Sequence, residues 1–129
     1  MICDTKLLIV DDEETICQGC RRILGREGFR VQTSTDASEG LSLAREWRYD
    51  AILLDIRMPD MDGIEFLEEL RKTDSEVPVI IITGYPSTAS EAAAKRLGAA
   101  HYITKPFTPD KIADAVRDLL RPEDLQGWL

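Results

Sequence analysis

Residues 53–63 read LLDIRMPDMDG, and the apolar run that leads into them begins at Ala51. A short run that is apolar throughout is typical of a strand buried on both faces of a parallel sheet. A carboxylate at the end of such a run, here Asp55, is costly unless a cation or a hydrogen-bond donor meets it. The turn residues from Pro59 to Gly63 then lead into a helical pattern. This stretch therefore predicts a strand–helix unit of an α/β fold, with a functional carboxylate where the strand ends.

The rest of the chain repeats this pattern. Residues 7–10 and 79–82 are also apolar throughout, and they predict two more strands buried on both faces. Residues 29–33 alternate in polarity, which is typical of an edge strand, and residues 102–104 form a shorter fifth candidate. Amphipathic stripes with helical spacing follow the strands, at 16–24, 41–47, 64–70, 90–97 and 112–120. Regular alternation with short links predicts one α/β domain, with helices on both faces of a parallel sheet.

Two helix starts and one helix end carry specific expectations. Asp36 and Asp62 precede their stripes and are predicted to cap them. Trp47 closes the second stripe, and we expect its ring to be packed there. Cys20 shares the apolar face of the first helix, so it is expected in the core rather than in a redox or zinc site.

Composition limits the function classes. The chain has 129 residues, of which 43% are hydrophobic, and its formal charge is −8. That sign argues against direct binding of nucleic acid and against docking on anionic lipid. Three cysteines, an odd number, favour a reducing compartment, and no signal-peptide pattern or membrane-length apolar run is present. A cytoplasmic protein is the expectation.

Polar residues gather where the predicted strands end. Asp11 and Asp12 follow the first strand, Asp55 ends the third, Thr83 ends the fourth, and Lys105 follows the fifth. In open α/β sheets, ligands bind beyond the carboxyl ends of the strands. If the first and third strands are neighbours, three carboxylates converge, and they repel one another unless a cation neutralises them. Mg²⁺ fits such a cluster. A carboxylate nucleophile with a metal, a lysine and a hydroxyl is suited to phosphoryl transfer.

Four motifs carry a resemblance to a known family. They are LLIVDDEE at 7–14, LLDIRMPDMDG at 53–63, IITG at 81–84 and HYITKPF at 101–107. In order and spacing they resemble the receiver domain of two-component response regulators, over nearly the whole chain. The resemblance implies a flavodoxin-like, doubly wound (βα)5 fold with strand order 2-1-3-4-5. It places a receiver domain at 1–121 and a short C-terminal tail at 122–129.

The resemblance also implies a role for each site residue. Asp55 would take a phosphoryl group from the phosphohistidine of a sensor histidine kinase or a phosphotransfer protein. Asp11, Asp12, Asp55 and the backbone carbonyl of Arg57 would hold Mg²⁺. Lys105 and Thr83 would contact the phosphoryl group once it is attached. Beyond phosphorylating and slowly dephosphorylating itself, the domain is not expected to be an enzyme.

The output of the domain is implied in the same way. Thr83 and Tyr102 would form the switch that alters the surface of helix 90–97, strand 102–104 and helix 112–120. A downstream effector domain or protein would bind this surface, which also allows a phosphorylation-dependent homodimer. Arg57 and Tyr85 would flank the phosphoryl group, and a contact between their side chains is predicted to shield it from water and lengthen its life. The Lys105–Pro106 bond is cis in many receivers.

Other functions fit the sequence less well, and one remains open. Phosphatases with an aspartate nucleophile need a second aspartate two positions later, where Arg57 stands. Nucleotide-binding domains need a glycine-rich turn after the first strand, where the sequence is Asp-Asp-Glu-Glu. The open alternative is a degenerate receiver that acts as a phosphorylation-independent interaction module.

Overall fold

A computed structural model describes residues 4–120 of the chain. The strands are β1 (Lys6–Val10), β2 (Arg30–Ser34), β3 (Ala51–Asp55), β4 (Val79–Thr83) and β5 (His101–Thr104). The helices are α1 (Glu14–Arg26), α2 (Ala37–Glu46), α3 (Gly63–Thr73), α4 (Thr88–Arg96) and α5 (Pro109–Leu119). The predicted tail, 122–129, lies outside the described residues, as does Cys3. None of the described helices is long and apolar enough to cross a membrane.

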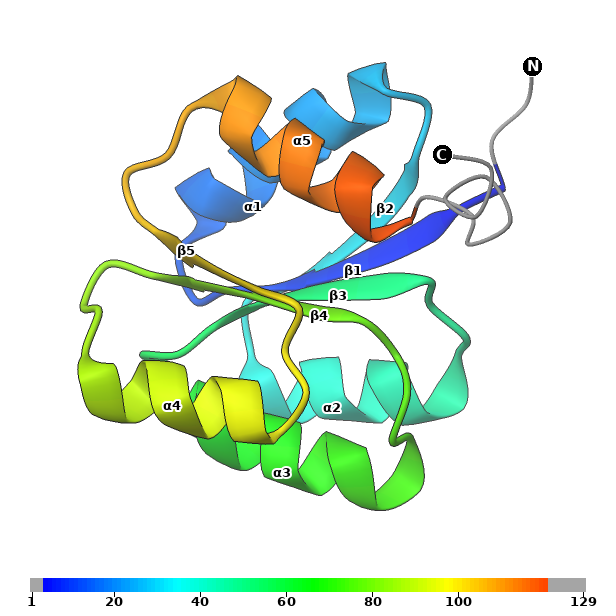
Figure 1. The fold of residues 1–129 in the computed structure, drawn as a ribbon. Helices are drawn as coiled ribbons and strands as arrows, with labels where there is room; N and C mark the ends of the chain where they lie inside the picture. Colours follow the sequence, from blue (N-terminus) through cyan, green and yellow to red (C-terminus); the bar gives the residue numbers. More distant parts are fainter. Residues whose placement is uncertain (1–3, 121–129) are drawn as a thin grey trace, which may run out of the picture.

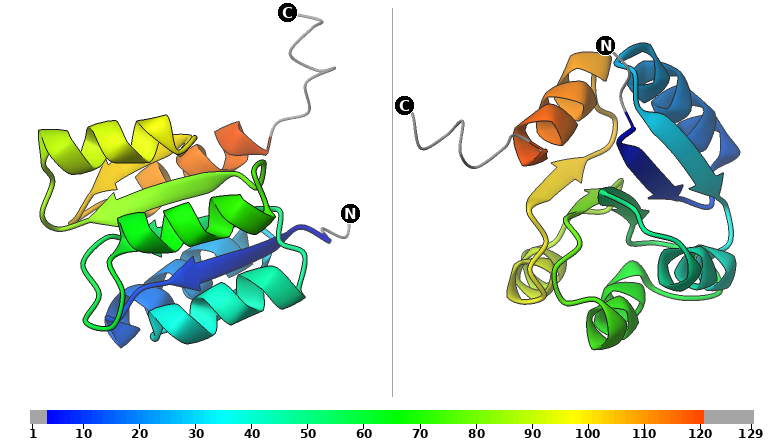
Figure 2. Two further views of the ribbon diagram at one scale, coloured as in Figure 1. Left: turned by 90° about the horizontal axis from the view of Figure 1, so that it is seen from below. Right: turned by 90° about the vertical axis from the view of Figure 1, so that its right-hand side faces the viewer.

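The strands form one parallel sheet in the order β2-β1-β3-β4-β5, which confirms the predicted fold class and strand order. Helices α1 and α5 cover one face, and α2, α3 and α4 cover the other (Figure 1). The view from below shows these three helices side by side across the sheet (Figure 2). Because all strands run the same way, their carboxyl ends share one edge, on the left in Figure 1.

The core explains why the central strands are apolar throughout. Every residue of β3 and β4 is buried, and so are Leu7 to Val10 of β1. Side chains alternate between the two faces, so Leu53 packs in the cluster beneath α1 and α5 while Leu54 packs in the cluster over α2 and α3. Sheets covered on both faces leave no side for polar residues except at the strand ends.

Capping residues fix where α2 and α3 begin. The Asp36 carboxylate accepts a hydrogen bond from the Ser38 N–H at 2.9 Å, and Asp62 accepts one from the Ile64 N–H at 2.7 Å, which confirms both predicted caps. Asp60 is a second acceptor for the Ser38 N–H, at 3.1 Å. The loop that follows β3 is therefore tied to the start of α2.

Gly63 brings the start of α3 against the end of β3. Its N–H donates to the Ile56 carbonyl oxygen at 2.8 Å. A Cβ at this position would collide with the Asp55 carbonyl oxygen and would lie 2.7 Å from the Ile56 Cα. Only glycine fits between these backbones, so this residue fixes the path of the chain just after Asp55.

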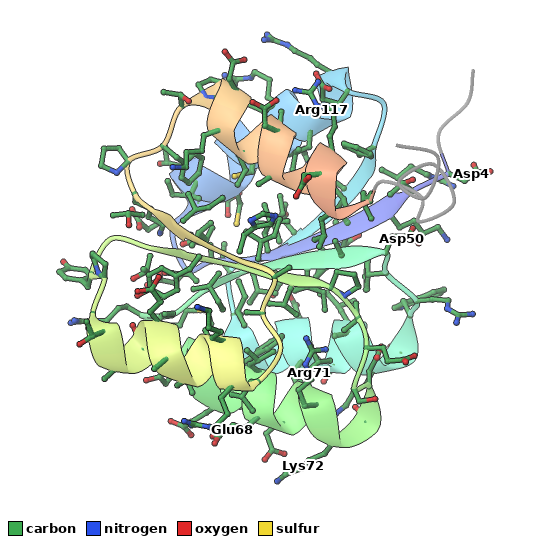
Figure 3. The ribbon with its side chains drawn as sticks, viewed as in Figure 1. Asp4, Asp50, Glu68, Arg71, Lys72 and Arg117 are labelled. Atoms are coloured by element: carbon green, nitrogen blue, oxygen red, sulfur yellow. The ribbon has the colours of Figure 1, made fainter. Side chains whose placement is uncertain are left out.

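Helix α4 is held mainly at its ends. Ala94 is its only buried residue. At its C-terminal end, the Arg71 guanidinium of α3 donates to the Leu97 carbonyl oxygen at 2.8 Å and to the Gly98 carbonyl oxygen at 3.4 Å. The same group donates to the Val77 carbonyl oxygen at 2.8 Å. Figure 3 shows Arg71 rising from α3 towards the segment that joins α4 to β5.

The prediction for Trp47 is wrong. The residue is 62% exposed, and it follows α2 instead of belonging to it. Its backbone is extended, with φ −120° and ψ 156°, which takes the ring off the helical stripe on which the packing was expected.

Candidate functional site

Four carboxylates converge at the carboxyl edge of the sheet. Asp11 follows β1 and Asp55 ends β3, and these strands are neighbours. One oxygen from each of Asp11, Asp12, Glu13 and Asp55 lies within 4.8 Å of all the others. The sequence predicted the convergence of three of these residues, and Glu13 is an additional member.

The two central carboxylates of this cluster are buried, and their negative charge is not fully balanced. Asp11 is fully buried and Asp55 is 3% exposed. Burial and the nearby Asp11 charge raise the pKa of Asp55 to about 7, although Lys105 acts in the opposite direction. Burial also raises the pKa of Asp11, despite its hydrogen bond with Lys105. One lysine therefore does not neutralise the cluster.

Lys105 is the cation at the centre of the site. Its Nζ lies 2.8 Å from an Asp11 oxygen, 2.9 Å from a Glu13 oxygen and 3.6 Å from an Asp55 oxygen. Burial would lower the pKa of Lys105, but its hydrogen bonds to Asp11 and Glu13 raise it above the ordinary value. The lysine is charged in this setting. The Lys105–Pro106 bond is cis.

Glu13 is the partner that sequence reasoning missed. Acidic residues at the start of a helix ordinarily cap it or favour its dipole. Glu13 is the N-cap of α1, yet its side chain makes no capping hydrogen bond. It pairs with Lys105 instead, a residue 92 positions away. No local pattern reveals such a contact.

The residues present fit a hard divalent cation. The Oδ2 atom of Asp11 is buried, and apart from the Lys105 ammonium at 2.8 Å it has no polar partner among the described residues. A buried carboxylate oxygen with an unused lone pair is suited to metal coordination. The donor set consists of carboxylates. Hard cations such as Mg²⁺ and Ca²⁺ prefer these oxygen ligands, whereas softer metals prefer sulfur or nitrogen ligands.

Thr83 ends β4 and Tyr102 lies in the neighbouring strand β5, and the hydroxyl of each is hydrogen-bonded to groups outside the acidic cluster. The Thr83 hydroxyl is buried and accepts a hydrogen bond from the Tyr85 N–H at 3.0 Å. The Tyr102 hydroxyl lies 2.6 Å from the Ser90 Oγ and accepts from the Ser87 N–H at 3.2 Å. Ser87 is the N-cap of α4, so Tyr102 of β5 is linked to the first turn of that helix. The alanine-rich sequence of α4 gave no sign of a role for Ser90.

Arg57 and Tyr85 meet above the site, as their positions in the sequence suggested. The Arg57 guanidinium carbon lies 4.2 Å from the centroid of the Tyr85 ring. The Tyr85 side chain is 65% exposed. Both residues line a hollow of about 430 Å³ that also contains Asp12. The pair therefore shares a hollow with Asp12, one member of the carboxylate cluster.

Comparison with known proteins identifies the family. The family model described as the response regulator receiver domain matches residues 7–117. The chain belongs to this family. The receiver domain is 39% identical to the uncharacterised transcriptional regulatory protein YkoG of Bacillus subtilis, over 89% of the chain and 50% of YkoG. It is 34% identical to the response regulator MprA of Mycolicibacterium vanbaalenii, over 95% of the chain and 54% of MprA. It thus spans about half the length of these relatives.

Solved structures agree with the sequence match. A CheY-like receiver domain protein from Methanospirillum hungatei superposes with a TM-score of 0.87 at 33% identity, over 90% of the receiver domain and 93% of that chain. The response regulator TrrA of Thermotoga maritima, solved in complex with Mg²⁺ and beryllium fluoride, gives a TM-score of 0.82 at 31% identity. That match covers 90% of the receiver domain and 99% of TrrA. The acidic cluster fits the Mg²⁺ site of receiver domains.

Proposed function

We propose that this receiver domain is a phosphorylation-controlled switch and that Asp55 is its phosphoacceptor. The observation that carries the proposal is the convergence of Asp55 with three further carboxylates and the Lys105 ammonium at one sheet edge. The site of TrrA, whose structure contains Mg²⁺ and beryllium fluoride, supports it by analogy. The role of Asp55 follows from its place at the end of a buried strand, with its carboxylate directed at the cluster.

The chemical step is a transfer between two nucleophiles. A carboxylate oxygen of Asp55 attacks the phosphorus of a phosphohistidine on a sensor histidine kinase or phosphotransfer protein. The phosphorus–oxygen bond forms as the phosphorus–nitrogen bond breaks, and the imidazole leaves with the electron pair and takes up a proton. The product is an aspartyl phosphate. Water later attacks that phosphorus, which restores the carboxylate and releases inorganic phosphate.

Mg²⁺ is the cofactor we propose for this step. Asp11, Asp12, Asp55 and the backbone carbonyl of Arg57 would hold it, and the bound cation would neutralise the phosphoryl oxygens during transfer. A pKa of Asp55 raised to about 7 by burial and by the Asp11 charge, even with Lys105 nearby, supports a further cation in the cluster.

Lys105 would change partners when the phosphoryl group arrives. In the structure its ammonium is closer to Asp11 and Glu13 than to Asp55. A phosphoryl group on Asp55 adds negative charge on that side, and a charge-assisted hydrogen bond to one of its oxygens would draw the ammonium over. The Thr83 hydroxyl would donate to another phosphoryl oxygen and would give up the hydrogen bond that it now accepts from the Tyr85 N–H.

The switch would reach the surface through Tyr102. A movement of Thr83 changes the space beside Tyr102, whose hydroxyl is bonded to the first turn of α4. The α4–β5–α5 surface would then change its arrangement. We propose this surface as the binding site of a downstream effector domain or protein, and as the contact in a phosphorylation-dependent homodimer. We also propose a cytoplasmic location, which the proposed partners and chemistry support.

Arg57 and Tyr85 are proposed to set the lifetime of the phosphoryl group. Their side chains are in contact and line the hollow that contains Asp12, where they would hinder the approach of water. The double variant Arg57→Ala, Tyr85→Ala is expected to lose its phosphoryl group faster than wild type. Equal rates of loss would remove these residues from the proposal and leave the phosphoacceptor role of Asp55 intact.

Intact mass measurement with Mg²⁺ and acetyl phosphate tests the central proposal. Wild type should gain one phosphoryl group, whereas Asp55→Asn should gain none. Asp60→Asn is a matched control, because Asp60 lies in the same loop and outside the cluster. It should be labelled like wild type. If wild type gains no mass, the chain is a phosphorylation-independent interaction module. Equal labelling of Asp55→Asn would exclude Asp55 as the acceptor.

A further inference from the structure

A cationic groove lies at the opposite end of the sheet from Asp55. It has a volume of about 460 Å³ and is formed where α2 ends beside the starts of β1 and β2. Its walls include Lys6, Arg30, Leu43, Trp47, Arg48 and Tyr49. The groove is open because α2 stops at Glu46 and does not cover the first residues of the two strands. Lys6 and Arg30, which are neighbours in the parallel register, are exposed there.

The charge of this groove is opposite to that of the whole chain. Lys6, Arg30 and Arg48 line it, and no carboxylate does. Within residues 4–120, none of these three cations forms an ion pair, whereas Arg45, Lys72 and Arg117 each do. The nearby Asp50 carboxylate accepts a hydrogen bond from the backbone N–H of Lys6. In a chain of formal charge −8, this is a local attraction for anions.

The groove also offers backbone and apolar contacts. Strand β2 is the first in the sheet order and pairs only with β1, so its outer N–H and C=O groups have no strand partner among the described residues. Figure 2 shows this edge open between α1 and α2. Trp47, at 62% exposure, stands on the helix side of the groove with the half-buried Tyr49. A free edge strand beside a side-chain groove is the arrangement by which extended peptides are bound.

We propose that this groove binds an extended acidic segment of a partner protein. The segment would lie along β2, with its backbone paired to the strand edge. Side chains at alternate positions fall on the same face, about 7 Å apart. Carboxylates at such positions would meet Arg30 and Arg48, and an apolar side chain would pack on Trp47. A polyanion such as nucleic acid fits less well, because the rest of the chain would repel it and the groove holds only three cations.

The groove and the phosphorylation site lie at opposite ends of the strands. Arg30 begins β2, whereas Asp55 ends β3. Among the described residues, no ion pair or side-chain hydrogen bond joins Lys6, Arg30 or Arg48 to the acidic cluster. Docking in the groove should therefore be independent of phosphorylation, and a partner would stay bound in both states of the switch. This separation also makes the proposal independent of the proposed function.

Titration with defined peptides, followed by backbone amide NMR, tests the proposal. The probe is an acetylated peptide of sequence EVEVEVEV, and its counterpart is KVKVKVKV. Only the acidic peptide should shift the amide signals of residues 30–32 and 47–49. The variant Arg30→Glu, Arg48→Glu should bind it about tenfold more weakly or worse. Adding Mg²⁺ and beryllofluoride should change the affinity less than twofold.

A matched variant separates the groove from general charge. Lys95 and Arg96 are exposed cations at the end of α4, so Lys95→Glu, Arg96→Glu changes the formal charge equally at another place. This variant should bind the acidic peptide like wild type. The proposal is overturned if the groove signals do not move, if both double variants lose affinity equally, or if the groove variant binds like wild type. It is also overturned if a DNA duplex shifts these signals at lower concentration, or if a second copy of the chain occupies the groove without peptide.

Discussion

Replacing Gly63 with alanine should loosen the backbone contact between the start of α3 and the end of β3, next to Asp55. The added Cβ would lie 2.7 Å from the Ile56 Cα, whereas ordinary contacts begin at 3.4 Å. Both neighbours are backbone, so no side chain can rotate away. Overpacking of this kind costs about 1–3 kcal/mol, and loss of the Gly63 N–H bond to Ile56 adds about 1 kcal/mol. The free energy of unfolding should fall by about 2–4 kcal/mol.

Urea unfolding measures this loss, and Gly19 supplies the control. With a typical slope of about 2 kcal/mol/M, the Gly63→Ala midpoint should fall by roughly 1–2 M. Gly19 lies inside α1 and has no atom within 4 Å of the position of an added Cβ. Gly19→Ala should therefore gain about 0.5–1 kcal/mol. A Gly63→Ala protein that unfolds at the wild-type urea concentration would show that the two backbones separate freely, and the reasoning would be wrong.

Three further outcomes are expected. Ser90→Ala and Tyr102→Phe each remove one end of the hydroxyl contact between them, so their effects on the free energy of unfolding should be non-additive by about 0.5–1.5 kcal/mol; additive effects in urea unfolding would exclude the contact. Arg71→Ala should cost about 2–3 kcal/mol by the same assay, and Arg71→Lys should recover little of it, because a lysine cannot donate to several carbonyl oxygens in fork geometry. Burial raises the pKa of Cys17 to about 11 and that of Cys20 to about 12, from the ordinary 9.0. In a Cys3→Ser background, the folded protein should not react with Ellman's reagent at pH 8, while both thiols should react in urea. These thiols also make stability depend on pH. The unfolded chain ionises its thiols from about pH 9, whereas the folded chain does so only at higher pH, so the free energy of unfolding should be highest below pH 9 and fall as the pH rises above 9. Rapid reaction of the folded protein would contradict the burial of these side chains.

Most of the fold could be predicted from local patterns. An amphipathic surface strand alternates apolar and polar residues, so runs that are apolar throughout indicated strands buried on both faces. Those runs form β1, β3 and β4. Asp36 and Asp62 marked helix starts because a capping carboxylate acts within three residues of itself. The strand order was different in kind. Short parallel connections allow several orders, and only the resemblance to receivers selected 2-1-3-4-5.

The site was predicted as a set of residues together with the contact between Arg57 and Tyr85, but its other side-chain contacts were not predicted. Parallel strands bring their carboxyl ends to one edge, so the sequence could place Asp11, Asp55 and Lys105 together. It could not indicate that Glu13 pairs with Lys105 or that Ser90 meets Tyr102, because those contacts depend on the paths of two loops. The prediction that Trp47 is packed was wrong for a related reason: a helical stripe does not reveal the residue at which the helix ends.

Because of the way α4 is attached, a shift of this helix requires little free energy. When a helix with a broad apolar face shifts, it loses several kcal/mol of stabilisation from buried apolar surface, and the core must repack. Helix α4 buries only Ala94, and polar contacts from Tyr102 at one end and Arg71 at the other hold it. A few hydrogen bonds of about 1 kcal/mol each decide its position. Sequence drift at these end contacts could retune how readily the helix shifts while every residue of the sheet stays the same.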